Sequence, residues 1–162
     1  MNFSPPTESE LELIREGSME YGADILRPIR GRSLLVAHGR REVFLVSEGA
    51  GKLMENLDGA YCAGLSLGEI KGKKFRLGLE GAFLIAREAA NRVVVNDKGE
   101  QLSLYGRDIF INSVLRYPPL KEGMKCLIVN RHEEPLALGI FRGGRVFVEN
   151  VKDRGWYLRK GG

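Results

Sequence analysis

Short apolar segments follow one another closely after Asn91, and they constrain the fold of this chain more than any other feature of its sequence. The segments are RVVVN, KCLIVN, ALGIF, RVFVEN and WYLR, and turn-forming residues separate them, with NDKG at 96–99 as the first turn. Strand-length runs at such close spacing are typical of small β-barrels. Gly143 and Gly144 predict a two-residue hairpin, because the central residues of a primed turn need positive φ. With one helix-like stretch at 108–114, this region is predicted to form a mostly closed β-barrel.

The residues before this region show a mixed pattern of helices and strands. Thr7 and Glu10 have the spacing of a capping box, which predicts a helix beginning near Thr7. Further predicted elements are two strands around a turn at 38–41, a helix after Ser47, strands within 60–70 and 73–77, and a helix within 79–90. The predicted fold class is therefore α+β, with an N-terminal α/β domain at 1–90 and a β-barrel domain at 91–162.

The net charge of +4 is unevenly distributed along the chain. Residues 1–68 carry seven cations and ten acids, whereas residues 69–162 carry eighteen cations and eleven acids. A cationic second half indicates a polyanionic partner, and an acidic first half would be repelled by that partner and free to bind another protein. The alternative is a soluble surface whose charges have drifted without function.

The motifs that usually mark a catalytic, nucleotide or metal site are incomplete in this chain. VSEGAGKLM resembles a phosphate-binding loop, but Val46 and Leu53 stand where that motif needs a glycine and a hydroxyl. The histidines and cysteines show no spacing typical of metal ligands, and nothing in the sequence activates either thiol. We therefore expect no catalytic residue, no metal and no cofactor.

The sequence also indicates where the protein works. The first ten residues have neither the basic region nor the apolar core of a secretory signal, and no apolar run is long enough to span a membrane. The two cysteines, Cys62 and Cys126, lie far apart in an uncharged setting, which is typical of a reduced protein. The expected location is the cytoplasm, or the nucleolus if the source is eukaryotic.

Three basic segments are candidate contacts for nucleic acid, and the first is KGKKFRL. If Phe75 and Leu77 face inward on a strand, the neighbouring cations face outward together and can bind phosphates. These possible additional RNA contacts are Lys71, Lys73, Lys74 and Arg76. An edge strand that uses lysines to repel unwanted strand partners explains the same pattern equally well.

The second segment is LYGRD. Here Gly106 predicts a tight turn, and a helix that begins after it would offer free backbone N–H groups to an anion. Arg107 would add a forked donor for a phosphate or a base edge. The alternative is an ordinary helix start with Asp108 as its cap.

The third segment is the C-terminal VKDRGWYLRKGG, which we interpret as a final strand. Trp156 and Leu158 would then face the barrel, while Tyr157 faces outward beside cations. Cations bind backbone phosphates, and a ring can stack on an unpaired base, so this combination favours single-stranded or looped RNA. The predicted RNA contacts are Lys152, Arg154, Arg159, Lys160, Tyr157 and Arg107. A closing strand with incidental charges is the alternative.

Residues 67–159 resemble the Nip-seven family of ribosome-biogenesis factors, which act on the large subunit in archaea and eukaryotes. The resemblance is carried by KKFRL, LYG, PLALGI and, in order, Asp153, Gly155, Tyr157 and Arg159. It implies an antiparallel sheet in the first domain, and a PUA domain, named after pseudouridine synthases and archaeosine transglycosylases, in the second. A PUA domain is an RNA-binding pseudo-barrel. In this family, RNA contact is attributed to basic residues near the last strand of the PUA domain.

The same resemblance implies a function without catalysis, in pre-ribosomal RNA processing and large-subunit assembly. The implied partners are pre-ribosomal RNA and other assembly or RNA-processing factors, with the exosome as one candidate. An RNA-modifying enzyme, or its accessory subunit, is the alternative, because PUA domains are commonly attached to such enzymes. It would require a catalytic carboxylate or thiol in the first domain, for which Asp58 and Cys62 are the candidates. A third reading, an adaptor for mature ribosomes, differs only in its partner.

Overall fold

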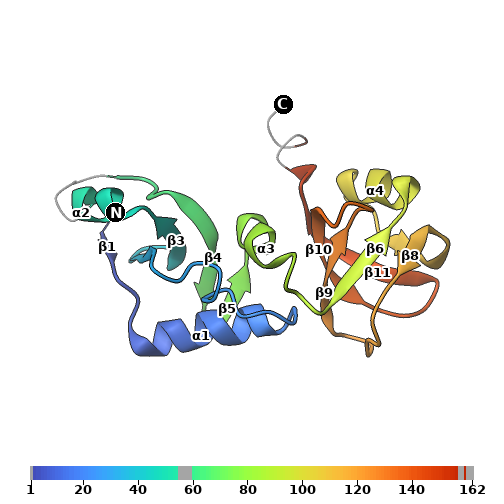
Figure 1. Ribbon diagram of the computed structural model, residues 1–162, viewed down its shortest axis with the longest axis horizontal. Helices are drawn as coiled ribbons and strands as arrows, with labels where there is room; N and C mark the ends of the chain where they lie inside the picture. The colour runs from blue at the N-terminus through green and yellow to red at the C-terminus, as the bar shows by residue number, and fades with distance from the viewer. Residues whose placement is uncertain (1, 55–59, 157–158, 160–162) are drawn as a thin grey trace. The chain divides into compact units, whose positions relative to one another are not determined.

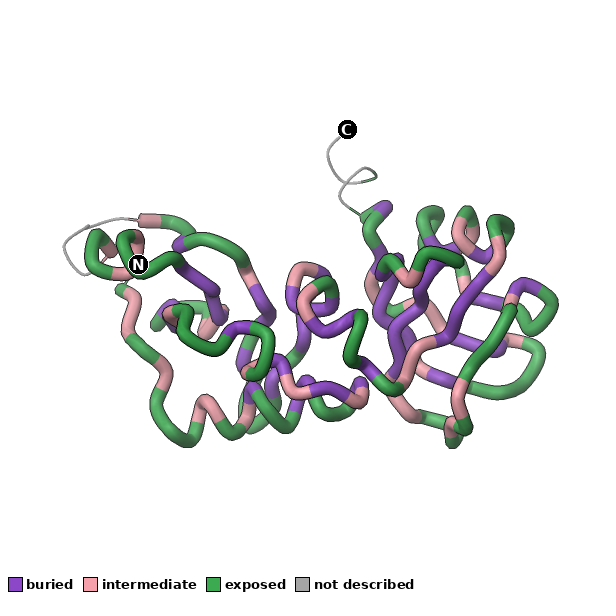
Figure 2. Tube along the Cα trace, in the orientation of Figure 1, coloured by how far each residue is buried: buried purple, intermediate pink, exposed green. Residues whose placement is uncertain are grey.

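The computed structural model describes residues 2–54, 60–156 and 159 (Figure 1). The chain divides into two compact units, the first formed by residues 1–19 and 24–84 and the second by 20–23 and 85–162. Figure 2 shows buried residues concentrated along the strands of both units. No helix in the described part of the chain is both long and apolar enough to cross a membrane.

The first unit is an antiparallel sheet with helices. Its strands, in sheet order, are β1 (Phe3–Ser4), β2 (Ser33–Ala37), β3 (Glu42–Val46), β4 (Leu65–Lys71) and β5 (Lys74–Leu77). Its helices are α1 (Glu8–Met19), α2 (Glu48–Met54) and α3 (Leu79–Ile85). The predicted strand pair around 38–41, the helix after Ser47 and the antiparallel sheet are thus confirmed.

Helix α1 begins at the predicted capping box and packs against β5. The Thr7 amide donates to Glu10 Oε2 at 3.0 Å, and the Glu10 amide donates to Thr7 Oγ1 at 3.2 Å. These bonds satisfy backbone N–H groups that have no partner inside the helix. Further along, a Cβ on Gly17 would lie 2.5 Å from the Phe75 carbonyl oxygen, so the glycine allows the helix to lie directly on β5.

The second unit is a nearly closed, barrel-like sheet. Its strands, in sheet order, are β7 (Ile109–Phe110), β11 (Val146–Asp153), β10 (Pro135–Phe141), β9 (Lys125–Val129), β6 (Arg92–Val95) and β8 (Val114–Arg116). Only the β6–β9 pair is parallel among the described pairs. The core is formed by side chains from these strands, among them Val93, Ile128, Leu136, Phe147 and Val148. The strands predicted at RVVVN, KCLIVN, ALGIF and RVFVEN are confirmed.

A short piece of the N-terminal sequence belongs to this second unit. Tyr21 is buried, and its carbonyl accepts from the Asn91 amide at 3.2 Å. The Gly22 carbonyl accepts from the Ala90 amide at 3.1 Å, and Lys125 forms an ion pair with Glu20. Burial raises the pKa of the Tyr21 hydroxyl, so this side chain stays neutral.

The helix of the second unit does not lie where the sequence predicted it. The stretch at 108–114 contains β7 and the short 3-10 helix η1 (Ile111–Ser113), whereas the helix of this region is α4 (Asp97–Leu104). NDKG, interpreted as a turn, is the helix start, since Asn96 Oδ1 accepts from the Gly99 amide at 3.0 Å. The hairpin at FRGGR also differs, because among its residues only Gly143 has positive φ and four residues connect β10 to β11.

The division of the sequence into an acidic and a basic half does not coincide with its division into two compact units. The residues of the first unit include eleven cations and eleven acids, and those of the second include fourteen cations and ten acids. The basic residues 71–76 belong to the first unit, which explains the difference from a count that ends at residue 68. The charge balance therefore gives no reason to place a protein partner on the first unit.

Candidate nucleic-acid interface

The C-terminal segment is anchored by an ion pair between the buried Asp153 side chain and the partly exposed Arg159 side chain. Arg159 donates to both carboxylate oxygens of Asp153, each at 3.0 Å, and the Asp153 side chain is only 6% exposed. The hydrogen bond to Asp153 raises the pKa of the Arg159 guanidinium above its usual value, so this side chain stays charged. A two-pronged contact of this kind fixes the orientation of both side chains. In this structure Arg159 thus acts first as an anchor of the segment.

The same arginine connects this segment to the end of α4. Arg159 Nη1 donates to the Leu104 carbonyl at 2.6 Å, and this carbonyl lies in the last turn of the helix, where oxygens have no partner inside the helix. A cation is favourable there, because the C-terminal end of a helix carries partial negative charge. The helix start predicted directly after Gly106, and with it the anion site, is therefore wrong, since α4 ends before this glycine and the next element is the strand β7.

Two glycines make this contact possible. Gly106 has a φ of 72°, and a Cβ there would lie 2.7 Å from Arg159 Nη2. A Cβ on Gly155 would lie 1.7 Å from the Leu104 oxygen, closer than any side chain allows. The family resemblance was carried by LYG and by the series that contains Asp153, Gly155 and Arg159. In the folded protein these two segments pack against each other.

The predicted final strand at 156–159 is wrong for its described residues. Strand β11 ends at Asp153, and Trp156 and Arg159 are helical, with the Arg159 amide donating to the Gly155 carbonyl at 3.0 Å. Trp156 does not close the barrel. It is 39% exposed, and the Lys152 ammonium lies 5.7 Å from the centre of its ring. Leu158, Tyr157 and Lys160 lie outside the described residues.

Exposed rings and cations surround this anchored segment. Tyr105 is 73% exposed and ends α4, and Arg107 is exposed one residue beyond Gly106. The Asn150 amide group donates to the carbonyl of Arg107 at 3.2 Å, which connects the loop to β11. We call the described side chains around this segment the C-terminal surface: Tyr105, Arg107, Lys152, Arg154 and Trp156. Sequence reasoning missed Tyr105, although its place directly before Gly106 at a helix end was a usable signal.

The KGKKFRL segment, the first of the three predicted basic segments, lies in the first unit. Phe75 and Leu77 of β5 are buried, while Lys74 and Arg76 are exposed, so the predicted alternation is confirmed. Lys71 and Lys73 are also exposed, at the end of β4 and in the following turn. Arg76 lies 4.0 Å from Glu69. This segment and the C-terminal surface belong to different units.

The described residues form no cluster of the kind that holds a metal ion. No cluster of three His, Cys, Asp or Glu side chains occurs among them. Cys62 is exposed and Cys126 is buried, where desolvation raises the thiol pKa to about 12. Asp58 lies outside the described residues.

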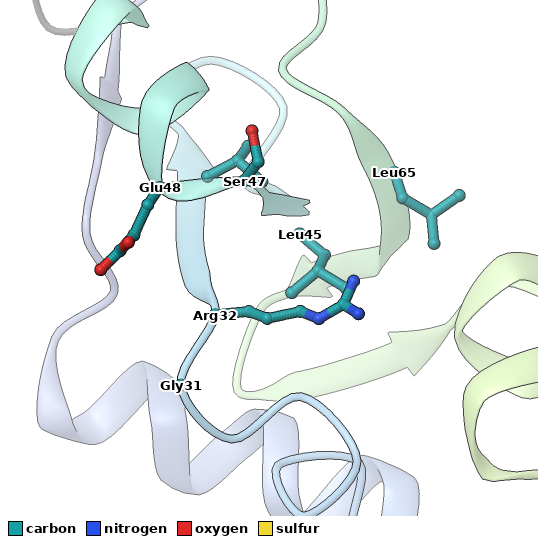
Figure 3. A pocket seen from close by; sticks show the side chains of 7 residues that line it. Gly31, Arg32, Leu45, Ser47, Glu48 and Leu65 are labelled. Carbon is teal, nitrogen blue, oxygen red and sulfur yellow. The ribbon is translucent and has the colours of Figure 1, made fainter.

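One hollow of about 330 Å³ lies in the first unit. Its lining residues are Gly31, Arg32, Leu45, Val46, Ser47, Glu48 and Leu65. In Figure 3 the Arg32 side chain reaches below Leu45, and the Glu48 carboxylate points away from the Arg32 side chain. The two charged side chains that line this hollow, Arg32 and Glu48, thus point in different directions.

Both halves of the chain match family models. Residues 3–79 match the NIP7/UPF0113 pre-PUA domain, and residues 91–162 match the UPF0113 PUA domain. Over 98% of its length the chain is 40% identical to a UPF0113 protein of Archaeoglobus fulgidus, covering 95% of that protein. It is also 31% identical to a UPF0113 protein of Aeropyrum pernix, covering 98% of this chain and 92% of the relative.

Solved structures show the same fold. A conserved PUA domain protein from Thermoplasma acidophilum superposes with a TM-score of 0.63 at 17% identity, covering 95% of each chain. A hypothetical protein from Pyrococcus horikoshii superposes with a TM-score of 0.58 at 17% identity, covering 96% of this chain and 98% of that one. Sequence identity over nearly the whole length, together with the two matching models, decides the assignment: this chain belongs to the NIP7/UPF0113 family, whose members pair a pre-PUA domain with a PUA domain.

Proposed function

We propose that this protein binds single-stranded or looped RNA through its C-terminal surface and works, without catalysis, in pre-ribosomal RNA processing and large-subunit assembly. The observation that carries the proposal is the gathering of two exposed rings and three cations around a rigidly anchored segment of a PUA domain. Cations bind backbone phosphates, and exposed rings stack on bases that are not paired. An unbroken duplex hides its bases and would leave the rings unused.

The anchor supports this proposal by fixing the surface before RNA arrives. Asp153 and Arg159 hold the turn that carries Arg154 and Trp156, and the Leu104 carbonyl holds the turn against α4. A surface that is already ordered loses little conformational entropy on binding. Arg159 therefore contributes mainly by positioning the other residues, and phosphate contact falls to Arg107, Lys152 and Arg154, with Lys160 and Tyr157 as additional proposed contacts.

A salt titration of RNA affinity tests the proposal. The triple variant Arg107→Ala/Lys152→Ala/Arg154→Ala should reduce the slope of log affinity against log salt by about 2, since each phosphate contact to a single strand contributes about 0.7. A control variant that removes the same charge elsewhere in the second unit is Lys98→Ala/Lys121→Ala/Arg145→Ala, whose positions are all exposed. Equal slopes for the two variants would contradict the proposed site.

Trp156 provides a direct reading of binding at this surface. It is the single tryptophan of the chain, so its fluorescence reports on one place. Single-stranded RNA should quench its emission, whereas polyphosphate, which has the charges but no bases, should change it much less. Unchanged emission at saturating RNA would show that the RNA binds elsewhere.

The cellular role needs a separate experiment. Crosslinking the protein to RNA in cells and sequencing the bound fragments should recover precursors of large-subunit RNA. Recovery of messenger or transfer RNA alone would contradict the role in assembly. Nucleoside mass analysis after incubation with ribosomal RNA should show no change, and stoichiometric modification would favour the RNA-modifying alternative.

A further inference from the structure

Two turns lie side by side at one end of the sheet in the first unit. The first connects β2 to β3 and contains Arg40 and Arg41, and the second connects β4 to β5 and contains Gly72 and Lys73. Arg41 joins them, because its carbonyl accepts from the Ile70 amide at 2.9 Å and its Nη1 donates to the Gly72 carbonyl at 3.2 Å. Its Nη2 also donates to Glu10 at 3.2 Å, so α1 takes part in the same arrangement.

The cations of this region share one face of the sheet. In an antiparallel pair, residues directly opposite one another project to the same side. Lys71 lies opposite Lys74, and Glu69 opposite Arg76, so these four side chains are on one face. Ile70 and Phe75, on the other face, are buried on the side where α1 packs.

This face is continuous with the apolar cluster covered by α2. Glu42 lies opposite Glu69 and therefore projects to the same side, and Phe44 and Val46 follow it at alternate positions of β3. Phe44 and Val46 pack with Ala63, which places this residue, just before β4, on the same face. The covered part of the face thus lies beside an open, charged part.

Cations outnumber acids in the open part. The acids are largely engaged, since Glu10 binds Arg41, Glu42 accepts from Ser66 and Glu69 lies near Arg76. Among the described residues no carboxylate lies within ion-pair distance of the three lysines Lys71, Lys73 and Lys74. All three are exposed, and a partner with negative charge can approach them without breaking an ion pair.

The aromatic ring of Tyr61 lies next to this charged region. Tyr61, in the loop before β4, is 69% exposed, and the Arg40 guanidinium lies 5.1 Å from the centre of its ring. Arg40 immediately precedes Arg41, which is bonded to the lysine-bearing turn. The contact with Arg40 orients the ring while most of its surface stays open to solvent.

From this arrangement we propose a second RNA-binding surface on the first unit, formed by Arg40, Tyr61, Lys71, Lys73 and Lys74. The lysines bind the phosphates of a single strand, and Tyr61 stacks on one of its bases. This inference adds a site to the proposed function but does not depend on the C-terminal surface.

The chemistry favours single-stranded RNA over other polyanions. A membrane surface or an acidic peptide would use the lysines but would leave the exposed ring of Tyr61 beside Arg40 without a partner. Edge protection of the sheet accounts for Lys74 on β5, which is the edge strand. It does not account for Lys71, because β4 is paired on both sides.

The test compares full-length variants by RNA affinity as a function of salt. Lys71→Ala/Lys73→Ala/Lys74→Ala should reduce the slope for a single-stranded RNA by about 2. Tyr61→Ala should weaken RNA binding about fivefold or more, as expected for a lost stacking contact, and should leave polyphosphate binding unchanged. The control Lys98→Ala/Lys121→Ala/Arg145→Ala removes the same number of charges. The salt dependence of its RNA affinity should be steeper than that of the lysine variant.

The outcomes for the two surfaces are distinguishable. If the lysine variant keeps the wild-type slope while Arg107→Ala/Lys152→Ala/Arg154→Ala loses its own, the second surface is refuted and the proposed function stands. The reverse result would refute the C-terminal surface and support the second one. A lysine variant that self-associates while binding RNA normally would show edge protection and overturn the inference. Selective loss of binding to anionic vesicles, or to a polyglutamate peptide, would also overturn it.

Discussion

Replacing Gly155 by alanine tests the anchored C-terminal segment most directly. The new Cβ would lie 1.7 Å from the Leu104 carbonyl oxygen and 2.8 Å from Arg159 Nη1, whereas ordinary contact begins at 3.4 Å. The segment must therefore move by roughly 1.7 Å, which is enough to break the hydrogen bond between Arg159 and Leu104. Overpacking of this kind costs about 1–3 kcal/mol of unfolding free energy.

The measured effect follows from this cost. A loss of about 2 kcal/mol in a domain of this size lowers Tm by roughly 8–16 °C, if the second unit unfolds cooperatively. If the segment detaches instead, Tm changes less but the emission of Trp156 shifts toward that of a solvated indole. Calorimetry and tryptophan fluorescence on the same sample distinguish the two responses.

Gly49→Ala is the matched control. Gly49 lies in α2, and a Cβ there meets nothing within 4 Å. This substitution should keep stability or increase it by about 0.5–1 kcal/mol, because alanine is favoured over glycine within a helix. If Gly155→Ala matched the wild type in both Tm and Trp156 emission, the packing of this segment on α4 would be refuted.

Three further predictions concern a helix cap, a carboxylate and the thiols. Asn96→Ala should destabilise the second unit by about 1 kcal/mol in denaturant unfolding, because the first turn of α4 loses its side-chain acceptor; no loss would refute the cap. Hydrogen bonding from the Thr7 amide lowers the pKa of the Glu10 carboxyl from its ordinary value of 4.5. The unfolding free energy of the wild type should therefore fall as the pH drops from about 4.5 through the lower pKa of the folded state. Glu10→Gln should weaken this dependence of the unfolding free energy on pH, and an unchanged dependence would contradict the assignment. At pH 8 the native protein should react with one equivalent of a thiol reagent, at Cys62, and the protein in denaturant should react with two. Cys126 is protected in the native state because it is buried and its pKa is raised to about 12. Reaction of two equivalents with the native protein would show that the core opens.

The elements that the sequence predicted well depend on neighbouring residues. Thr7 and Glu10 satisfy each other across one turn, so their spacing is sufficient to place α1. The alternation of Lys74 and Phe75 likewise reflects a strand with one buried face. In both cases the sequence pattern that predicts the element lies within a few residues, although the helix that covers Phe75 is distant in the chain.

The elements that were mispredicted depend on residues far apart in the chain. Gly155 lies in a turn after β11 rather than in a continued strand because it packs on Leu104, which is about fifty residues away. Gly99 was interpreted as a turn residue, but it lies in α4, where a Cβ would come within 3.2 Å of the Cβ of Ser113, which is distant in the sequence, and within 2.6 Å of the Cβ of Val95. The second basic surface was only partly visible for the same reason, since Tyr61 and Arg40 meet only in the folded sheet.

The route of the chain limits how this protein can be divided for experiments. The segment Glu20–Ala23 leaves the first unit, packs in the second and returns, so the second unit is not one continuous stretch of sequence. A fragment that starts at residue 85 lacks Tyr21, and the Lys125 ammonium, 5.8 Å from the centre of that ring, loses its aromatic neighbour. Such a fragment exposes core that the intact chain covers, so cloning at the apparent domain boundary should yield a weaker domain than the one found in the whole protein.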